Sequence, residues 1–73
     1  MHTETKAAKI SRLAAVRKGD TFVLDGHTYV SKADAKRWTS KGTDCLVDNV
    51  YIEATRGAYC ADVFESMIME TGA

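Results

Sequence analysis

The segment AYCADVFESMIMETG, residues 58–72, decides the fold class that this sequence predicts. Its apolar residues recur as pairs every four positions: Tyr59/Cys60, Val63/Phe64 and Met67/Ile68. In a helix this spacing produces one continuous apolar face, with Asp62, Glu65 and Ser66 opposite it. In a strand, alternation would place Glu65 among the apolar residues of the buried face. The spacing therefore predicts a helix over residues 58–70.

A β-hairpin is predicted earlier in the chain by the run TFVLDGHTYVS, residues 21–31. Two β-rich runs flank Asp25-Gly26, a dipeptide that suits a two-residue type I′ turn because both positions need positive φ. That turn fixes the facing pairs as Leu24/His27, Val23/Thr28, Phe22/Tyr29 and Thr21/Val30. We therefore expect a hairpin over residues 20–31, with apolar side chains on both of its faces.

Two further elements are predicted on either side of this hairpin. Residues 4–16 are rich in alanine and have Thr3 as a candidate N-cap, which predicts an N-terminal helix. Residues 45–54, CLVDNVYIEA, have the composition of β-structure. They form either two short strands joined by a turn at Asp48-Asn49 or one strand with a bulge there.

A short helix is predicted directly after the hairpin. Ser31 and Asp34 have the spacing of a capping box, which favours a helix over residues 32–38. On such a helix Ala35 and Trp38 lie on one side and would turn inward. The neighbouring lysines would then be solvated.

Together these elements predict one domain of the α+β class, spanning residues 1–73. Its small antiparallel sheet would combine the hairpin 20–31 with strand or strands 45–54, and the N-terminal and C-terminal helices would pack on it. The alternative is an SH3-like small β-barrel, in which the C-terminal segment is extended instead of helical.

Composition limits the cellular setting that we expect. The chain has 73 residues, of which 45% are hydrophobic and 27% charged, values typical of a globular domain. Its longest uninterrupted apolar runs have four residues, far too short for a membrane span, and the N-terminus lacks the apolar core of a signal peptide. We expect a soluble, cytoplasmic protein with no membrane association.

No catalytic or metal-binding constellation is predicted. The possible soft ligands His2, His27, Cys45 and Cys60 are scattered, whereas structural zinc sites present their ligands in close pairs. A catalytic Cys–His pair is disfavoured because Cys60 is expected on the buried face of the last helix, where a thiol is unreactive. We expect a non-enzymatic protein without metal or cofactor, whose two cysteines are free thiols.

Charge is distributed unevenly, although the formal net charge is zero. Residues 1–41 carry nine Lys or Arg and four acids, whereas residues 42–73 carry one Arg and six acids. The possible contacts to an anionic partner are Lys32, Lys36, Arg37 and Lys41, which surround Trp38. Nucleic-acid binding by this basic half is therefore one hypothesis, with Trp38 or Tyr29 as a stacking platform. The neutral net charge weighs against it.

Protein–protein contact is the preferred hypothesis. The predicted C-terminal helix has a wider apolar arc than one sheet needs, and leftover apolar area marks an interface. We expect this interface to contain Phe64, Met67, Ile68 and Met69, either in a homodimer through the C-terminal helix or with another protein. The chain would then act as a regulator or inhibitor of a larger partner. Its size is that of accessory proteins encoded by phages and mobile elements.

Overall fold

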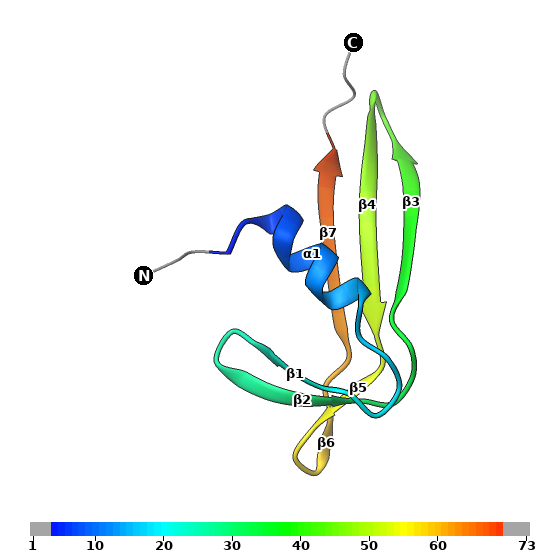
Figure 1. Ribbon diagram of the computed structural model, residues 1–73. Coiled ribbons are helices and arrows are strands. Elements are labelled where there is room, and N and C mark those ends of the chain that lie inside the picture. Colours follow the sequence, from blue (N-terminus) through cyan, green and yellow to red (C-terminus); the bar gives the residue numbers. More distant parts are fainter. Residues whose placement is uncertain (1–3, 70–73) are drawn as a thin grey trace.

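The computed structural model describes residues 4–69 and is built mainly from β-strands (Figure 1). Strands make up 55% of this region and helix 14%. The elements in order are α1 (Lys6–Ala14), β1 (Thr21–Leu24), β2 (His27–Ser31), β3 (Lys36–Gly42), β4 (Cys45–Ile52), β5 (Ala54–Arg56), β6 (Tyr59–Cys60) and β7 (Val63–Met69). The predicted α+β architecture, a sheet packed by two terminal helices, is therefore wrong.

The strands form two antiparallel sheets, and the chain passes from one sheet directly into the other at two places. One, here called the short sheet, has the order β1-β2-β5-β6, and the other, the long sheet, has the order β3-β4-β7. β4 leads into β5 through Glu53 alone, and β6 leads into β7 through two residues, so the two sheets are joined at a bend (Figure 1). The alternative SH3-like barrel has the C-terminal segment extended, as observed, but the strands form two sheets in place of one barrel.

The core lies where α1 and the first hairpin meet the bend. Ile10 and Leu13 of α1 and Val50 and Ile52 of β4 are fully buried. The rest of the buried cluster is Val16, Phe22, Leu24, Ala54 and Val63. α1 thus covers one face of the long sheet, because its only wholly buried side chains point there.

The C-terminal segment is a pair of strands, and Glu65 explains why the helix prediction failed. β7 lies antiparallel to β4, so that Val63, Glu65 and Met67 share the face that α1 covers. The carboxylate of Glu65 meets two ammonium groups from α1 there, those of Lys6 at 3.5 Å and Lys9 at 3.4 Å. An acid on this face is therefore paired, and the objection that excluded a strand does not apply.

Reversing this charge tests the pairing of β7 with α1. We expect Glu65→Lys to lower the free energy of unfolding by about 1–2 kcal/mol, because two ion pairs are lost and three cations converge. Glu53→Lys, the same change at an exposed acid, should cost less than about 0.5 kcal/mol. Urea unfolding followed by circular dichroism measures both. Equal costs for the two variants would place Glu65 in solvent, as the helix prediction did.

The predicted β-hairpin is confirmed residue by residue. All four predicted facing pairs occur, from Thr21/Val30 to Leu24/His27. Asp25 and Gly26 have φ values of 53° and 80°, as a type I′ turn requires. Phe22 and Tyr29 stack across the strands with ring centroids 5.3 Å apart.

The two elements that flank the hairpin are also confirmed, with small differences. Residues 45–52 form one strand with neither the turn nor the bulge predicted at Asp48-Asn49, and the chain continues into β5. The N-terminal helix starts at Lys6, and its cap is Thr5, whose hydroxyl accepts a hydrogen bond from the Ala8 N–H. The candidate cap Thr3 lies outside the described residues.

The short helix predicted over residues 32–38 is absent from the described structure. Ser31 is instead the buried last residue of β2, paired with Ala54, and its hydroxyl donates to the Ala33 carbonyl. Asp34 accepts a hydrogen bond from the Lys18 N–H at 2.8 Å and so belongs to a loop contact. Residues 32–35 form a bend, and β3 starts at Lys36.

Candidate functional site

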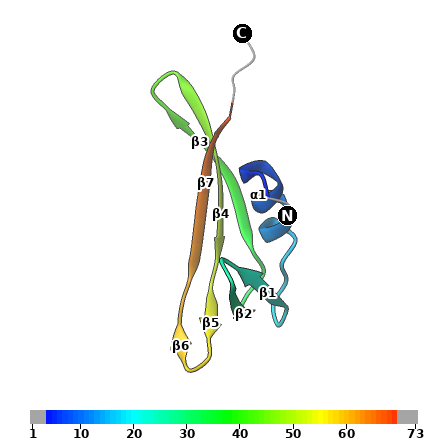
Figure 2. The ribbon, with the colours of Figure 1, turned by 90° about the vertical axis from the view of Figure 1, so that its left-hand side faces the viewer.

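The long sheet has one covered face and one bare face. Figure 2 shows α1 and the β1–β2 hairpin on the same side of this sheet, and no described element on the other. Side chains alternate along each strand, and Glu65 marks the covered face, so the register assigns the remaining residues. We call the bare side the open face. It consists of Lys36, Trp38, Ser40, Cys45, Val47, Asn49, Tyr51, Phe64, Ser66 and Ile68.

Large apolar side chains are exposed on the open face. Trp38 is 44% exposed, Phe64 55% and Ile68 70%. The rings of Trp38 and Phe64 lie 6.0 Å apart and are tilted by 49°, although the two residues belong to the opposite edge strands β3 and β7. They meet across β4, so the patch extends over the width of the sheet. An exposed apolar cluster of this kind is typical of an interaction surface.

Asn49 occupies the middle of this patch and fixes β3 to β4. It lies between Trp38 and Ser66 in the register, and its side chain is buried. Its amide nitrogen donates to the Ser40 hydroxyl at 3.0 Å and to the Val47 carbonyl at 3.2 Å. These donors are used within the sheet, and the small amide leaves room for the two rings to meet above it.

Tyr51 and Asp62 close the end of the open face beside the bend. The Tyr51 hydroxyl donates to Asp62 at 2.7 Å, and the second oxygen of Asp62 accepts the Ala54 N–H at 3.2 Å. The hydrogen bonds from Tyr51 and Ala54 lower the pKa of Asp62, and the carboxylate raises the pKa of Tyr51. This contact joins β4, β5 and the loop before β7, and so holds the patch at a fixed angle to the short sheet.

The four basic residues singled out in the sequence do not form one surface. Lys36 lies on the open face, next to Tyr51 in the register. Arg37 points to the covered side, where it makes two hydrogen bonds to Asp48, at 2.7 and 3.1 Å. Lys41 lies at the far end of β3. Lys32 lies in the connection between β2 and β3, with its ammonium nitrogen 4.0 Å from the Cys60 sulfur.

The four predicted interface residues are divided between the two faces of β7. Phe64 and Ile68 belong to the open face. Met67 and Met69 alternate with them and lie on the covered side, where Met67 packs against the core. Trp38, which was expected to turn inward, is exposed instead, whereas Ala35 packs against the core as predicted.

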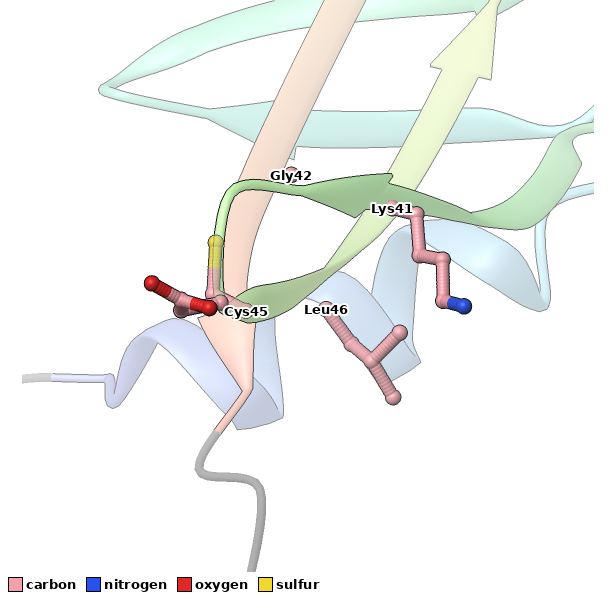
Figure 3. Close-up of a pocket in the computed structure, with 5 residues that line it drawn as sticks. Lys41, Gly42, Cys45 and Leu46 are labelled. Atoms are coloured by element: carbon pink, nitrogen blue, oxygen red, sulfur yellow. The ribbon is translucent and has the colours of Figure 1, made fainter.

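The cysteines and one shallow hollow lie away from the patch centre. Both thiols are free, but Cys60 is exposed and not buried as predicted. Cys45 lies at the β3–β4 turn, where Lys41, Gly42, Asp44 and Leu46 join it in lining an open hollow (Figure 3). A side chain at Gly42 would come within 2.8 Å of the Cys45 sulfur, so glycine suits this position.

The described residues contain no further arrangement that suggests chemistry. In residues 4–69 no three His, Cys, Asp or Glu side chains are grouped so that they could hold a metal ion, and His2 lies outside this range. The helix of this region is too short to cross a membrane.

Comparison with protein-family models, with curated proteins and with solved structures found no match. The open face is therefore the feature on which a function can be argued. The preferred interpretation of the sequence placed Trp38 in the interior, although the nucleic-acid hypothesis used it as an exposed platform, and Tyr51 was missed. The signal that could have found them is strand alternation, which puts Lys36, Trp38 and Ser40 on one side of β3.

Proposed function

We propose that this protein is a small non-enzymatic binding protein, which uses the open face to contact another protein and so regulates or inhibits it. The observation that carries the proposal is the exposure of Trp38, Phe64 and Ile68 on a sheet face that no described element covers. Aromatic side chains that gather at the centre of an exposed patch are typical binding hot spots. A two-layer domain has no structural need for them there.

The charges around the patch indicate the kind of partner. Lys36 is the one charged residue of the open face as defined above, and Asp62, at the end of this face, already accepts hydrogen bonds from Tyr51 and Ala54. Glu65 and Asp48 lie on the covered side and are already paired. A partner surface with an apolar centre and an acidic rim beside Lys36 is therefore complementary.

Nucleic-acid binding remains the second candidate, because one observation favours it. Trp38 is exposed on the same face as Lys36 and Phe64, and nucleic-acid bases stack on such side chains. The electrostatic contribution is weak, however, since Arg37 is engaged by Asp48 and only one lysine shares the face. Several phosphate contacts are needed for substantial affinity at physiological salt.

The test compares two aromatic residues of the open face with an exposed aromatic residue elsewhere. We expect Trp38→Ala and Phe64→Ser each to weaken partner binding about thirtyfold, as loss of a hot spot does. Tyr59→Ala is the matched control, because Tyr59 is 75% exposed on the short sheet. It should change binding less than about twofold.

Binding is measured on a protein captured from cell lysate, then purified and titrated with each variant. Because Trp38 is the single tryptophan, a blue shift of its fluorescence on titration reports contact at the open face. If Tyr59→Ala weakens partner binding and Trp38→Ala does not, the proposal is refuted. Anisotropy of labelled DNA and RNA oligonucleotides tests the second candidate, and binding that depends on Trp38 and salt would favour it instead.

A further inference from the structure

The two edge strands of the long sheet differ sharply in their residues. β3, with the sequence KRWTSKG, carries three cations in seven residues. β7, with the sequence VFESMIM, carries one acid and no cation. Natural sheets protect their edges from pairing with another chain by placing lysine, proline or a bulge there. β3 therefore has this protection, and β7 lacks it.

The outer edge of β7 is accessible within the described structure. β7 pairs with β4 on one side and has no strand on the other in the sheet order. Figure 1 shows α1 and the first hairpin extending past this edge, and Figure 2, which looks toward the edge, shows both on the covered side of β7, so the edge is open from the other side. Alternate residues of this seven-residue strand thus offer backbone donors and acceptors to an added strand.

The single charge of β7 does not oppose the approach of another strand. Glu65 is held by Lys6 and Lys9 of the same chain, and its side chain is only 18% exposed. On the other face of the strand, Phe64 and Ile68 are largely exposed. An added strand would cover part of this apolar surface.

The sequence of β7 is complementary to itself when two copies pair antiparallel about Ser66, its central residue. Phe64 of one copy then faces Ile68 of the other, and Glu65 faces Met67. Aromatic and β-branched residues form favourable cross-strand pairs, and like charges do not meet. A register centred on Glu65 would bring two carboxylates together, and one centred on Met67 would place Phe64 beyond the end of the other β7, so the Ser66 register is preferred.

We propose that the protein forms a symmetric dimer in which the β7 strands of two copies pair along their outer edges about Ser66. The two long sheets then become one sheet of six strands, with β3 at both outer edges. The symmetry closes this contact, because each copy uses the same edge and leaves only the basic edge of its long sheet free. The inference goes beyond the proposed function, since it concerns the strand edge and names a second copy as the partner, although Phe64 and Ile68 belong to both surfaces.

The test places like charges on the symmetry axis. Sedimentation velocity over a range of concentrations should show the wild-type protein changing from one chain to two. Ser66→Lys is expected to raise the dimer dissociation constant about tenfold or more, because two lysines face each other across the axis. Thr39→Lys, which adds the same charge at an exposed residue of β3, should leave the constant within about twofold.

A charge-swap experiment separates loss of pairing from loss of folding. Ser66→Glu alone should weaken the dimer as Ser66→Lys does, whereas an equal mixture of the two variants should restore it. Circular dichroism checks that each variant is folded. A wild-type protein that stays a single chain at every concentration overturns the proposal. So does a dimer that Thr39→Lys disrupts and Ser66→Lys does not. Growth beyond two chains also overturns it, because it would mean that β3 pairs with β7 head to tail. Partner binding through Trp38 is measured independently of these outcomes.

Discussion

Replacing Ile52 by alanine should lower the free energy of unfolding by about 3 kcal/mol. Ile52 is fully buried at the end of β4, opposite Val63, in the cluster that joins α1 to the long sheet. The substitution leaves a cavity beside a fully buried neighbour, Val50, and a small core has few other side chains that can fill it. A domain of this length has a total stability of roughly 4–11 kcal/mol, so this loss is a large fraction of it.

The chain provides a matched control in Ile68, an isoleucine of β7 that is 70% exposed. Ile68→Ala should cost less than about 0.5 kcal/mol, provided that both variants are compared at a concentration where the protein is monomeric. Urea unfolding followed by circular dichroism measures the two costs. If the two costs were equal, or larger at Ile68, the open face would have to be buried within the monomer.

The second large effect is expected at Arg37. Its guanidinium makes two hydrogen bonds to Asp48, whose side chain is only 6% exposed. Arg37→Ala leaves that carboxylate without its partner in a site that water hardly reaches, and should lower the folding equilibrium constant about tenfold or more. Lys36→Ala, at the exposed neighbouring position, should change the constant less than about twofold.

The stabilities of wild type and Arg37→Ala should also respond differently to pH, which gives a second measurement. The hydrogen bonds from Arg37 lower the pKa of Asp48 below its ordinary value of 3.8. Their stabilisation is therefore complete above that value and is lost as the pH falls through the lower, folded-state pKa. The difference in the free energy of unfolding between wild type and Arg37→Ala should become smaller in this acidic range, because Asp48 then becomes neutral in both proteins. If this difference in the free energy of unfolding does not change with pH, the effect of Arg37 is due to packing alone.

The role of Arg37 in folding also means that an Arg37 variant is a poor test of binding. It was grouped with Lys36 as a possible contact to an anionic partner, yet it lies on the opposite face and is engaged by Asp48. A loss of binding in an Arg37 variant would reflect a loss of folded protein. Lys36 is the basic residue that can be tested for binding without this complication.

Parts of the fold could be predicted from the sequence because their causes are local. The Asp25-Gly26 turn fixes the first hairpin and its register within eleven residues. The strand at 45–52 and the helix at 6–14 likewise follow from composition and periodicity within one segment. Each of these elements needs no information from a distant part of the chain.

The wrong predictions concern segments whose structure depends on distant residues. Glu65 is acceptable in a strand because Lys6 and Lys9, far away in the sequence, meet it on the covered face. Ser31 has the spacing of a helix cap, but pairing with Ala54 and a hydrogen bond from its N–H to the Asp20 carbonyl keep it in β2. Local patterns favoured helix in both segments, and tertiary contacts overrode them.

The candidate site was the hardest part to predict. Apolar residues on both faces of β7 show that two surfaces need cover or partners, but the sequence does not tell which one α1 covers. The prediction for Phe64 and Ile68 stands as a proposal, whereas Met67 lies against the core. Trp38 was assigned to the interior because its segment was expected to be helical.

The continuity of β4 with β5, and of β6 with β7, also has a consequence for the order of folding. The two pairs form one long bent hairpin that begins at the turn after Arg56, where Gly57 has a φ of 63°. Within this hairpin, loop closure is cheapest at the turn, so pairing of its two arms can proceed outward from Arg56/Tyr59 through the bend to Leu46/Met69. β4 and β7 would then pair after β5 and β6, so their part of the open face forms late, at the end of the hairpin farthest from the turn.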